Sequence, residues 1–505
     1  IYNTKKVTTA PVIDGRITDD TWNVVEWAGD FKQWRPDEGK EPAQKTKFKI
    51  IYDEKHIYVA IRCYDTEPNK IVNRLSRRDG NAGDWVEVNF DSYHDLRTGY
   101  AFTITAAGVK GEEAISQNGR NWDSSWNPIW YAKTNIDEEG WTAEMKIPFT
   151  QVRFSDAKEQ IWGLQMHRNN FRENERSIWQ RIPRDLPGWI SNLGELHGIK
   201  NLKPQKQLEI QPYSVAQTER FEKEPGNPFA TGKKSNVNFG LDGKVGITNN
   251  LTLDFTINPD FGQVEADPSA IALDGFQIFQ REQRPFFVEN KNIFDYQVTQ
   301  AQAGGPYTRD NVFYSRRIGR SPQGGTTAGS GEYVNRPGNT TILGAAKFSG
   351  KTKSGLSIGV LEAVTQEELA EIDNGGTRRN EVIEPLTNFF LTRLQKEYNN
   401  SNTLIGGIIT ATNRNVSNAN LIDIHSAAYT GGVDFRHQWK NRTWYVEGNM
   451  VVSKVSGSKD AIYNTQTSLR HNFQRVDASH LSLDQNKTSL TGTGGNIKIG
   501  KSGGG

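Results

Sequence analysis

Tryptophan rings set among polar side chains are the groups in this sequence best suited to binding chemistry. They concentrate at 121–131, where Trp122, Trp126 and Trp130 alternate with aspartate, serine and asparagine. The C–H faces of a sugar stack on aromatic rings, and its hydroxyls pair with charged and amide groups. The pattern predicts a carbohydrate-binding site, and its candidate residues are Trp85, Glu87, Arg97, Trp122, Trp126 and Trp130.

The alternative for each ring is a place in a hydrophobic core, because tryptophan is largely buried in most folded domains. Trp126 and Trp130 share one face if their segment is extended, since side chains alternate along a strand. Eleven of the 13 tryptophans fall within the first 200 residues. This uneven distribution indicates two regions built on different principles.

One catalytic motif is matched in sequence but not in the structural context that it requires. Ser357 lies in a Gly-x-Ser-x-Gly sequence, but its neighbours alternate as in a strand and do not form the strand-to-helix turn that the motif needs. The adjacent carboxylates Glu112 and Glu113 are expected to be solvated charges, and no His-Glu-x-x-His zinc motif occurs in the sequence. We therefore expect a non-catalytic protein without a cofactor.

Metal binding and cysteine chemistry have few candidates. Asp91, Asp95 and Asp123 could supply oxygen ligands to calcium, although their spacing matches no calcium-binding loop. The single Cys63 excludes intramolecular disulfides, and its place in an apolar run indicates an inert core residue. We therefore expect no cofactor, and calcium binding is the alternative.

Composition excludes several classes of protein. The 61 Lys and Arg residues nearly balance the 59 Asp and Glu residues, so nucleic acid is not an expected partner. Hydrophobic residues make up 35% of the chain, and no apolar run approaches the roughly 20 residues of a membrane-spanning helix. Membrane β-barrels stay compatible with this composition, because their strands alternate polar and apolar residues.

From about residue 205 onward, the sequence alternates as strands with one apolar face do. Short connections such as 440–442 alternate with long ones such as 413–426. A membrane barrel sorts its connections in this way, with short turns at one end, whereas the alternative, a soluble sandwich, has no reason to do so. The ten predicted strands are 207–218, 236–247, 251–257, 340–349, 355–364, 387–398, 403–412, 427–439, 443–455 and 489–500.

The connections also predict an orientation. In an outer-membrane barrel the short turns face the periplasm, which places residues 1–200 there. The chain begins at Ile1 without a signal-peptide segment, as a processed protein would, and 500–505 resemble the start of another turn. Because an open sheet edge is not tolerated in lipid, we expect the barrel to be incomplete at the C-terminus of this sequence.

The segment 258–339 is too long for a simple loop and mixes aromatic residues with carboxylates and arginines. Such a segment suits a polar barrel interior, where arginines pair with carboxylates. It is predicted to form a plug or constriction, with an ordinary surface loop as the alternative. The plug candidates are Asp260, Glu265, Asp267, Arg284, Arg316, Arg317 and Arg320.

The first half is also rich in strands. The segments 48–52 and 56–65 form a predicted hairpin, because 53–55 is a tight turn between two apolar runs. Six to eight strands at this spacing are typical of a β-sandwich. The further predicted strands are 85–91, 100–104, 141–148 and 161–166.

Several motifs of the first half resemble family 9 carbohydrate-binding-like domains, in which two tryptophans clamp a terminal sugar. They are IDGRITDDTW at 13–22, YD with HIYV at 52–59, WVEVNFD at 85–91 and GWTAEMKIP at 140–148. Further motifs resemble an uncharacterised outer-membrane family, common in Bacteroidota, in which such a domain precedes a β-barrel. These motifs are NPDF and the residues after it at 258–268, RPFF at 284–287 and YSRRIG at 314–319.

These features predict an all-β protein with a periplasmic, carbohydrate-binding-like β-sandwich over 1–203 and a transmembrane antiparallel β-barrel over 204–505. The expected function is recognition or uptake of an envelope glycan at the outer membrane of a Gram-negative bacterium. Two alternatives stay open: a structural or assembly subunit of an outer-membrane complex, and a substrate-selective channel. The expected partners are outer-membrane lipid, a glycan or peptidoglycan, and envelope proteins.

Overall fold

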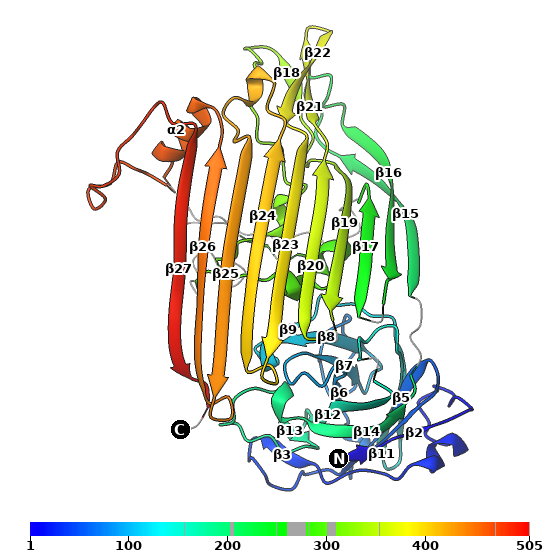
Figure 1. Ribbon diagram of the computed structural model, residues 1–505. Coiled ribbons are helices and arrows are strands. Elements are labelled where there is room, and N and C mark those ends of the chain that lie inside the picture. Colours follow the sequence, from blue (N-terminus) through cyan, green and yellow to red (C-terminus); the bar gives the residue numbers. More distant parts are fainter. Residues whose placement is uncertain are drawn as a thin grey trace.

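The computed structural model describes residues 1–155, 157–202, 207–248, 250–259, 279–280, 282–299, 310–352, 354–469 and 471–503. Strands dominate, arranged as a β-sandwich at one end of a tall sheet (Figure 1). No described helix is long and apolar enough to cross a membrane. The helices are α1 (Pro285–Val288), α2 (Lys459–Thr467) and the 3-10 helices η1 (Asp20–Val24), η2 (Pro68–Lys70), η3 (Gln117–Gly119), η4 (Ile190–Asn192), η6 (Lys291–Phe294), η7 (Ser315–Arg317) and η8 (Ala419–Leu421).

The β-sandwich consists of two sheets. The larger follows the order β1-β14-β12-β6-β7-β8-β9, with β13 paired to β12 and β3 paired to β13; the smaller follows β10-β11-β5-β4-β2. The larger sheet contains β1 (Tyr2–Asn3), β3 (Lys32–Arg35), β6 (Trp85–Asp91), β7 (Gly99–Thr105), β8 (Lys110–Ser116), β9 (Asn121–Asp123), β12 (Glu159–Asn170), β13 (Glu175–Ile178) and β14 (Gly194–Lys200). The smaller sheet contains β2 (Lys5–Lys6), β4 (Thr46–Tyr52), β5 (His56–Tyr64), β10 (Tyr131–Asp137) and β11 (Gly140–Pro148).

The sandwich core lies between these sheets and accounts for the apolar alternation of their strands. Val86, Val88 and Phe90 of β6 are 0% exposed and belong to one cluster with residues of the facing sheet. Trp141 of β11 and Trp162 of β12 join that cluster, also at 0% exposure. Large rings therefore fill much of the space between the layers, as expected where aromatic side chains dominate burial.

Two predictions for this region are confirmed. The strands β4 and β5 pair antiparallel with Tyr52 opposite Ile57, so the turn lies where the sequence indicated it. Cys63 is 0% exposed in the core. Burial raises the pKa of its thiol to about 12, which keeps it protonated and unreactive.

The second half forms a ten-stranded sheet in which every pair of neighbouring strands is antiparallel. The strands follow one another in chain order, except that the strands of a separate, smaller sheet are skipped. Each of the ten predicted strands has a counterpart. In the described residues the sheet is an open path whose ends are β15 and β27. The strands are β15 (Leu208–Arg220), β16 (Lys233–Gly246), β17 (Leu251–Ile257), β19 (Ile342–Lys351), β20 (Leu356–Thr365), β23 (Thr387–Tyr398), β24 (Thr403–Arg414), β25 (Ala427–Trp439), β26 (Trp444–Ser456) and β27 (Ser489–Lys501).

The two faces of this sheet differ in chemistry. The inner face carries charged residues such as Arg393 and Asp434, which hydrogen bond at 2.6 Å. The outer face is apolar and exposed, and Val433, at the centre of β25, is 62% exposed. Other exposed residues of the outer face are Leu208, Ile210, Val237, Phe239, Ile257, Leu394, Ile405, Ile409, Tyr429, Phe435, Met450, Val452, Ile497 and Ile499.

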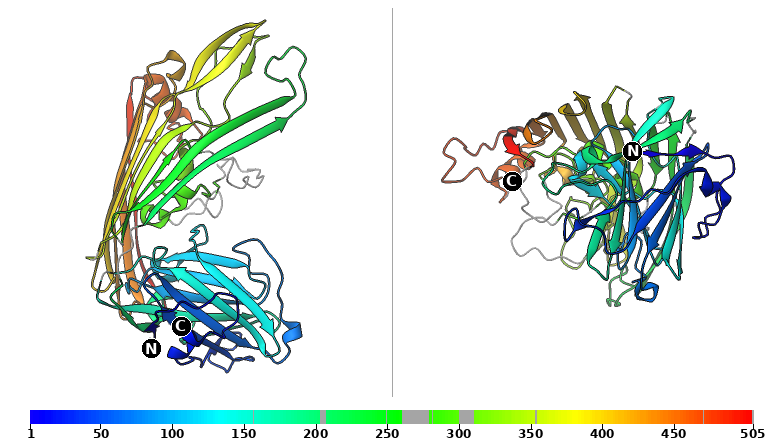
Figure 2. Two further views of the ribbon diagram at one scale, coloured as in Figure 1. Left: turned by 90° about the vertical axis from the view of Figure 1, so that its right-hand side faces the viewer. Right: turned by 90° about the horizontal axis from the view of Figure 1, so that it is seen from below.

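The connections are sorted between the two ends of the sheet. Short turns such as 399–402 lie at the end where the sandwich sits (Figures 1 and 2). Long connections lie at the opposite end. One of these, the long connection between the predicted strands 355–364 and 387–398, contains paired strands. They belong to a three-stranded sheet of β18 (Tyr333–Asn335), β21 (Glu368–Asn374) and β22 (Thr377–Glu384).

Residues 282–299 pack against the inner face of the ten-stranded sheet. Phe286 and Phe287 of α1 and Phe294 of η6 form an apolar cluster with Leu361 and Leu391 of the sheet. Figure 2 shows the sheet curving around this segment. The segment and the sandwich therefore share one side of the sheet.

Candidate functional site

The outer surface of the larger sandwich sheet carries a cluster of aromatic rings around Trp189, all of them half-buried except that of Trp85, which is buried. The ring of Trp189 lies 5.6 Å from that of Trp34 and 6.3 Å from that of Trp122, measured between centroids. His167 lies 4.8 Å from Trp189 and 6.4 Å from Trp85. We call Trp34, Trp85, Trp122, His167 and Trp189 the aromatic face.

A polar network beneath the rings fixes the orientation of His167. Its Nδ1 lies 3.2 Å from Glu87, and the same carboxylate accepts hydrogen bonds from Asn89 and Thr103, each at 2.8 Å. Burial alone raises the pKa of Glu87, but the contact with His167 and, after it, the hydrogen bonds from Asn89 and Thr103 outweigh burial and hold the pKa below its ordinary value. Asn89 in turn accepts from the indole N–H of Trp189 at 2.9 Å.

Two ring nitrogens of the aromatic face are buried without a hydrogen-bond partner among the described residues. They are Trp34 Nε1 and His167 Nε2. With Nδ1 donating to Glu87, a neutral His167 presents Nε2 as an acceptor. The two atoms are then one donor and one acceptor beside the ring of Trp189, and an unsatisfied buried polar atom in a native structure calls for an explanation, such as a bound water or ion.

The structure separates the six sugar-site candidates into three places. Trp85, Glu87 and Trp122 belong to the aromatic face or its supporting network. Trp126 and Trp130 are 9% and 1% exposed and pack against Phe102 at 5.5 and 5.3 Å, so they serve the core and offer no open ring face.

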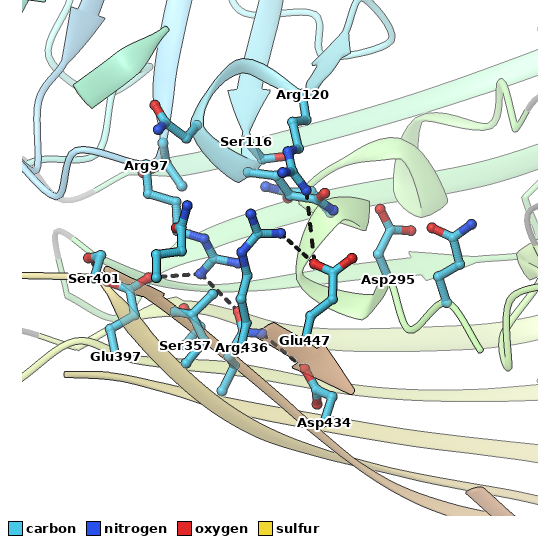
Figure 3. Close-up of a pocket in the computed structure, with 18 of the residues that line it drawn as sticks. Arg97, Ser116, Arg120, Asp295, Ser357, Glu397, Ser401, Asp434, Arg436 and Glu447 are labelled. Carbon is cyan, nitrogen blue, oxygen red and sulfur yellow. Dashed lines mark hydrogen bonds and ion pairs between the residues drawn. The ribbon is translucent and has the colours of Figure 1, made fainter. Parts of the chain in front are cut away.

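The third place is a cavity of about 930 Å³ between the sandwich and the inner face of the sheet. Arg97 and Arg120 line it from the sandwich, and Arg436 and Glu447 line it from the sheet (Figure 3). Trp189 also lines it from the sandwich. Because Trp189 also belongs to the aromatic face, the two features adjoin.

Ion pairs between strands of the sheet form the floor of the cavity. Arg393 of β23 donates to both carboxylate oxygens of Asp434 of β25, at 2.6 and 2.8 Å. Arg436 donates to Glu447 of β26 at 2.7 Å. Arg120 of the sandwich reaches the same carboxylate at 3.9 Å (Figure 3).

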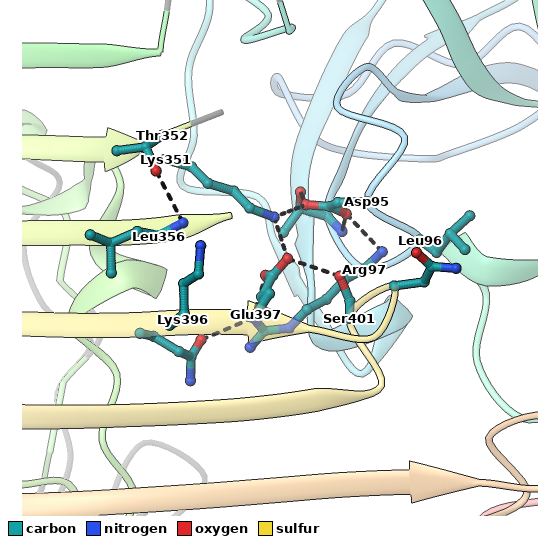
Figure 4. Close-up of polar contacts among 12 residues, drawn as sticks. Asp95, Leu96, Arg97, Lys351, Thr352, Leu356, Lys396, Glu397 and Ser401 are labelled. Atoms are coloured by element: carbon teal, nitrogen blue, oxygen red, sulfur yellow. Dashed lines mark hydrogen bonds and ion pairs between the residues drawn. The ribbon is translucent and has the colours of Figure 1, made fainter. Parts of the chain in front are cut away.

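A second ionic cluster closes the boundary between sandwich and sheet (Figure 4). Lys351 donates to Asp95 at 2.6 Å and to Glu397 at 2.7 Å. Arg97, one of the sugar-site candidates, donates to Glu397 at 2.9 Å. Arg97 is therefore engaged with the sheet and lies in the cavity wall, away from Trp85 and Glu87.

The plug candidates are partly accounted for. Asp260, Glu265 and Asp267 lie outside the described residues. Arg284 is buried, donates to Glu282 at 2.6 Å and to the carbonyl of Ile318 at 2.7 Å, and so holds two parts of the insertion together. The others lie nearby in sequence: Arg317 lies 6.0 Å from the ring of Tyr314, Arg320 lies 3.5 Å from Glu384, and Arg316 belongs to η7.

The calcium candidates have protein partners. Asp91 accepts from the backbone amides of Asp95 and Leu96, at 3.1 and 2.8 Å, and Asp123 accepts from Lys291 at 2.8 Å. In the described part of the chain, no group of three His, Cys, Asp or Glu residues is placed to hold a metal ion. These carboxylates instead support loops and contacts between segments.

One carboxylate expected to be solvated is buried. Glu112 is 2% exposed, accepts from Arg78 at 2.6 Å and from the indole N–H of Trp130 at 3.0 Å. Burial raises its pKa despite these partners. Its neighbour Glu113 does not share this position, because successive side chains of a strand point to opposite faces.

Several site residues were not singled out from the sequence. The charges Arg436 and Glu447 lie on the polar face of their predicted strands, but their contact depends on strand register, which alternation alone leaves open. Trp34 and Trp189 carry no spacing that distinguishes them from core tryptophans. They meet because Trp189, at the start of η4, folds back over the sheet.

Each half of the chain matches a known protein family model. The model of the domain of unknown function DUF5916 matches residues 204–488, and the model of carbohydrate family 9 binding domain-like proteins matches residues 13–182. No curated protein matches this chain.

Solved structures similar to the sandwich include two family 9 carbohydrate binding modules from Caldicellulosiruptor kristjanssonii. The complex with cellotriose has 20% identity, covers 40% of this chain and 94% of that chain, and has a TM-score of 0.29. The complex with glucose has 20% identity, 39% and 96% coverage and a TM-score of 0.29. A proposed carbohydrate-binding protein from Bacteroides uniformis has 16% identity, 39% and 98% coverage and a TM-score of 0.32.

The DUF5916 match spans more than half of the 505 residues, and the family 9 match spans most of the β-sandwich. This chain belongs to the DUF5916 family and begins with a domain like the family 9 carbohydrate-binding domains.

Proposed function

We propose that this chain is a non-catalytic outer-membrane protein that recognises a glycan through the aromatic face of its periplasmic β-sandwich. The observation that carries the glycan assignment is the pair of unpartnered ring nitrogens, Trp34 Nε1 and His167 Nε2, beside the ring of Trp189. A sugar supplies what this arrangement lacks. Its C–H face stacks on an indole, and its hydroxyls accept from one nitrogen and donate to the other.

The family 9 match supports the same assignment, because it covers the residues that build the aromatic face up to His167. The network from Glu87 to His167 fixes the ring before a ligand arrives. Preorganised groups of this kind lower the entropy cost of binding.

The membrane assignment is supported by the division between the two faces of the ten-stranded sheet. Val433, Ile409 and Met450 are each more than half exposed on the outer face. Charged pairs such as Arg393 with Asp434 occupy the inner face. A lipid-facing barrel wall has this arrangement, and exposed apolar surface of this extent is unusual in water.

The periplasmic orientation is supported by the position of the sandwich at the short-turn end of the sheet, since short turns face the periplasm in outer-membrane barrels. In this proposal residues 282–299 line or obstruct the barrel interior. Arg284 and its partner Glu282 hold that segment in shape.

Glycan binding by the whole chain in detergent tests the recognition step. Cellotriose and glucose serve as first probes, followed by peptidoglycan fragments. The double variant Trp34→Ala/Trp189→Ala is expected to lose binding, because it removes the stacking ring and the unpartnered donor. The matched control is Trp27→Ala, whose ring is 38% exposed and lies near Lys49 of the smaller sheet.

Retained affinity in the double variant, or no affinity for any glycan in the unmodified chain, would refute the recognition step. Fractionation of cells that express the chain tests the location separately. Recovery in the outer membrane with a sandwich that external protease does not reach is expected. Recovery as a detergent-free monomer would contradict the membrane assignment. The glycan titration would still test the recognition step separately.

A further inference from the structure

The cavity between sandwich and sheet carries an excess of positive charge. Among its described lining residues are eight arginines and lysines and four aspartates and glutamates. Three of the four carboxylates have a close cationic partner in the lining: Asp434 has Arg393, Glu397 has Lys351 with Arg97, and Glu447 has Arg436. The remaining charge is not spread evenly over the walls.

Three cations from three different elements converge on one carboxylate. Glu447 of β26 lies 2.7 Å from Arg436 of β25, 3.9 Å from Arg120 of the sandwich and 4.0 Å from Lys498 of β27. The same three cations approach the ring of Tyr445 at 5.1 to 5.6 Å. We call Arg120, Arg436 and Lys498 the cationic trio.

The trio is reachable from the cavity. The side chains of Arg120 and Lys498 are 38% and 42% exposed, while that of Arg436 is 19% exposed. All three line the cavity. Figure 3 shows Arg120 and Arg436 beside Glu447, with Asp295 on another segment of the wall. Like charges held this close repel one another, and an incoming anion relieves that repulsion.

We propose that the cavity binds the carboxylate of an acidic sugar, a hexuronate unit of the glycan, at the cationic trio. This inference rests on the proposed glycan recognition and names its substrate class. Trp189 joins the aromatic face to the cavity, so a chain that stacks on the aromatic face continues toward the trio. Arg436 and Arg120 provide planar guanidinium groups, which match the two oxygens of a carboxylate.

The test compares two trisaccharides of the same linkage, cellotriose and β-1,4-triglucuronate, by titration calorimetry on the whole chain in detergent. We expect triglucuronate to bind at least roughly tenfold more tightly, because a hydrogen bond to a charged group contributes about 1.5 kcal/mol or more. This preference should shrink as salt is raised, since the trio is partly open to solvent.

The double variant Arg120→Gln/Lys498→Gln is expected to abolish the preference, so that the two trisaccharides bind with similar affinity. Its matched control is Lys454→Gln/Arg475→Gln, which removes two exposed cations far from the cavity lining. Glu447→Gln is expected to have the opposite effect on the binding of triglucuronate. It keeps a hydrogen-bond acceptor for Arg436, removes the competing negative charge and should strengthen the binding of triglucuronate.

Equal affinity for the two trisaccharides in the unmodified chain would overturn this inference and leave glycan recognition standing. So would a preference that survives in the double variant. Displacement of triglucuronate by an equal concentration of inorganic phosphate would assign a simple anion site and also overturn it. Absence of binding by both trisaccharides would overturn this inference, and the peptidoglycan fragments would then decide whether the proposed recognition stands.

Discussion

Lys351, the last residue of β19, donates a hydrogen bond across the boundary between sheet and sandwich to Asp95, 2.6 Å away. The two side chains are 11% and 8% exposed. Burial alone raises the pKa of Asp95, but the Lys351 ammonium outweighs it and holds the pKa below its ordinary value. This pair, with Glu397 and Arg97, fixes the wall of the cavity that the aromatic face adjoins (Figure 4).

Lys351→Met is expected to loosen this boundary. Removing one member of a buried ion pair leaves the other charge uncompensated and costs about 3–5 kcal/mol. Hydrogen exchange of the whole chain should show lost protection at Leu96 and Arg97. The control Lys6→Gln breaks the exposed pair with Glu54 and should change little. Unchanged exchange at Leu96 in Lys351→Met would show that the pair does not hold the two parts together.

Trp130 and Trp189 are expected to respond to substitution in opposite ways. Trp130→Ala removes a ring that is 1% exposed in the core and should destabilise the sandwich by about 3–5 kcal/mol. Trp189→Ala removes a half-buried ring of the aromatic face and should lower glycan affinity with a smaller loss of stability. Chemical unfolding and glycan titration of each variant separate the effects. Equal loss of affinity in two folded variants would argue against a site at Trp189.

Glu144 is expected to make the sandwich less stable as pH rises from about 5 to about 7. The carboxylate is fully buried and accepts hydrogen bonds from Trp22 Nε1 at 3.1 Å and from the Gly15 amide at 2.9 Å. Burial dominates and raises its pKa from 4.5 to about 7. The folded chain therefore binds more protons than the unfolded chain in this window, and stability falls through it, by roughly 2 kcal/mol.

Glu144→Gln should remove that slope, because glutamine does not titrate. Thermal unfolding followed by near-ultraviolet circular dichroism at several pH values measures it, since Trp22 contacts the carboxylate. Stability that rises between pH 5 and 7 in the unmodified chain, or an unchanged slope in Glu144→Gln, would contradict the assignment.

Val433→Arg distinguishes lipid from water at the outer face of the sheet. Val433 is 62% exposed, so in water the change should be close to neutral. At the centre of a bilayer an outward arginine costs about 2–4 kcal/mol. Unfolding from lipid bilayers measures the difference, with Val476→Arg, at a fully exposed position outside the sheet, as the control. Equal, small effects at both positions would mean that the outer face does not contact lipid.

Much of the second half could be predicted because its strands have one apolar and one polar face. The predicted strand 443–455 and the observed Trp444–Ser456 differ by one residue at each end, and the turn before it falls where Lys440 and Asn441 adopt positive φ. The strands Glu368–Asn374 and Thr377–Glu384 lie beyond the sheet, in a connection that the sequence pattern predicts only as a long loop.

The site was harder to predict than the fold. In the sandwich both layers bury large rings, so Trp126 in the core and Trp122 on the aromatic face look alike in sequence. The contact between Arg120 and Glu447 joins residues far apart in the chain, and no local pattern reports how the sandwich docks on the sheet. Such contacts are set by packing between the two parts.

The indole N–H resonance of Trp34 gives the most direct measurement of the central claim, recognition of a glycan by the aromatic face. Two-dimensional nitrogen–proton spectra of the whole, deuterated chain in detergent would be recorded during a glycan titration. Trp141 is an internal control, because its Nε1 is also unpartnered among the described residues but lies in the core at 0% exposure. We predict saturable shifts at Trp34 and Trp189 with Trp141 unmoved; a glycan that binds without shifting Trp34 would contradict the account.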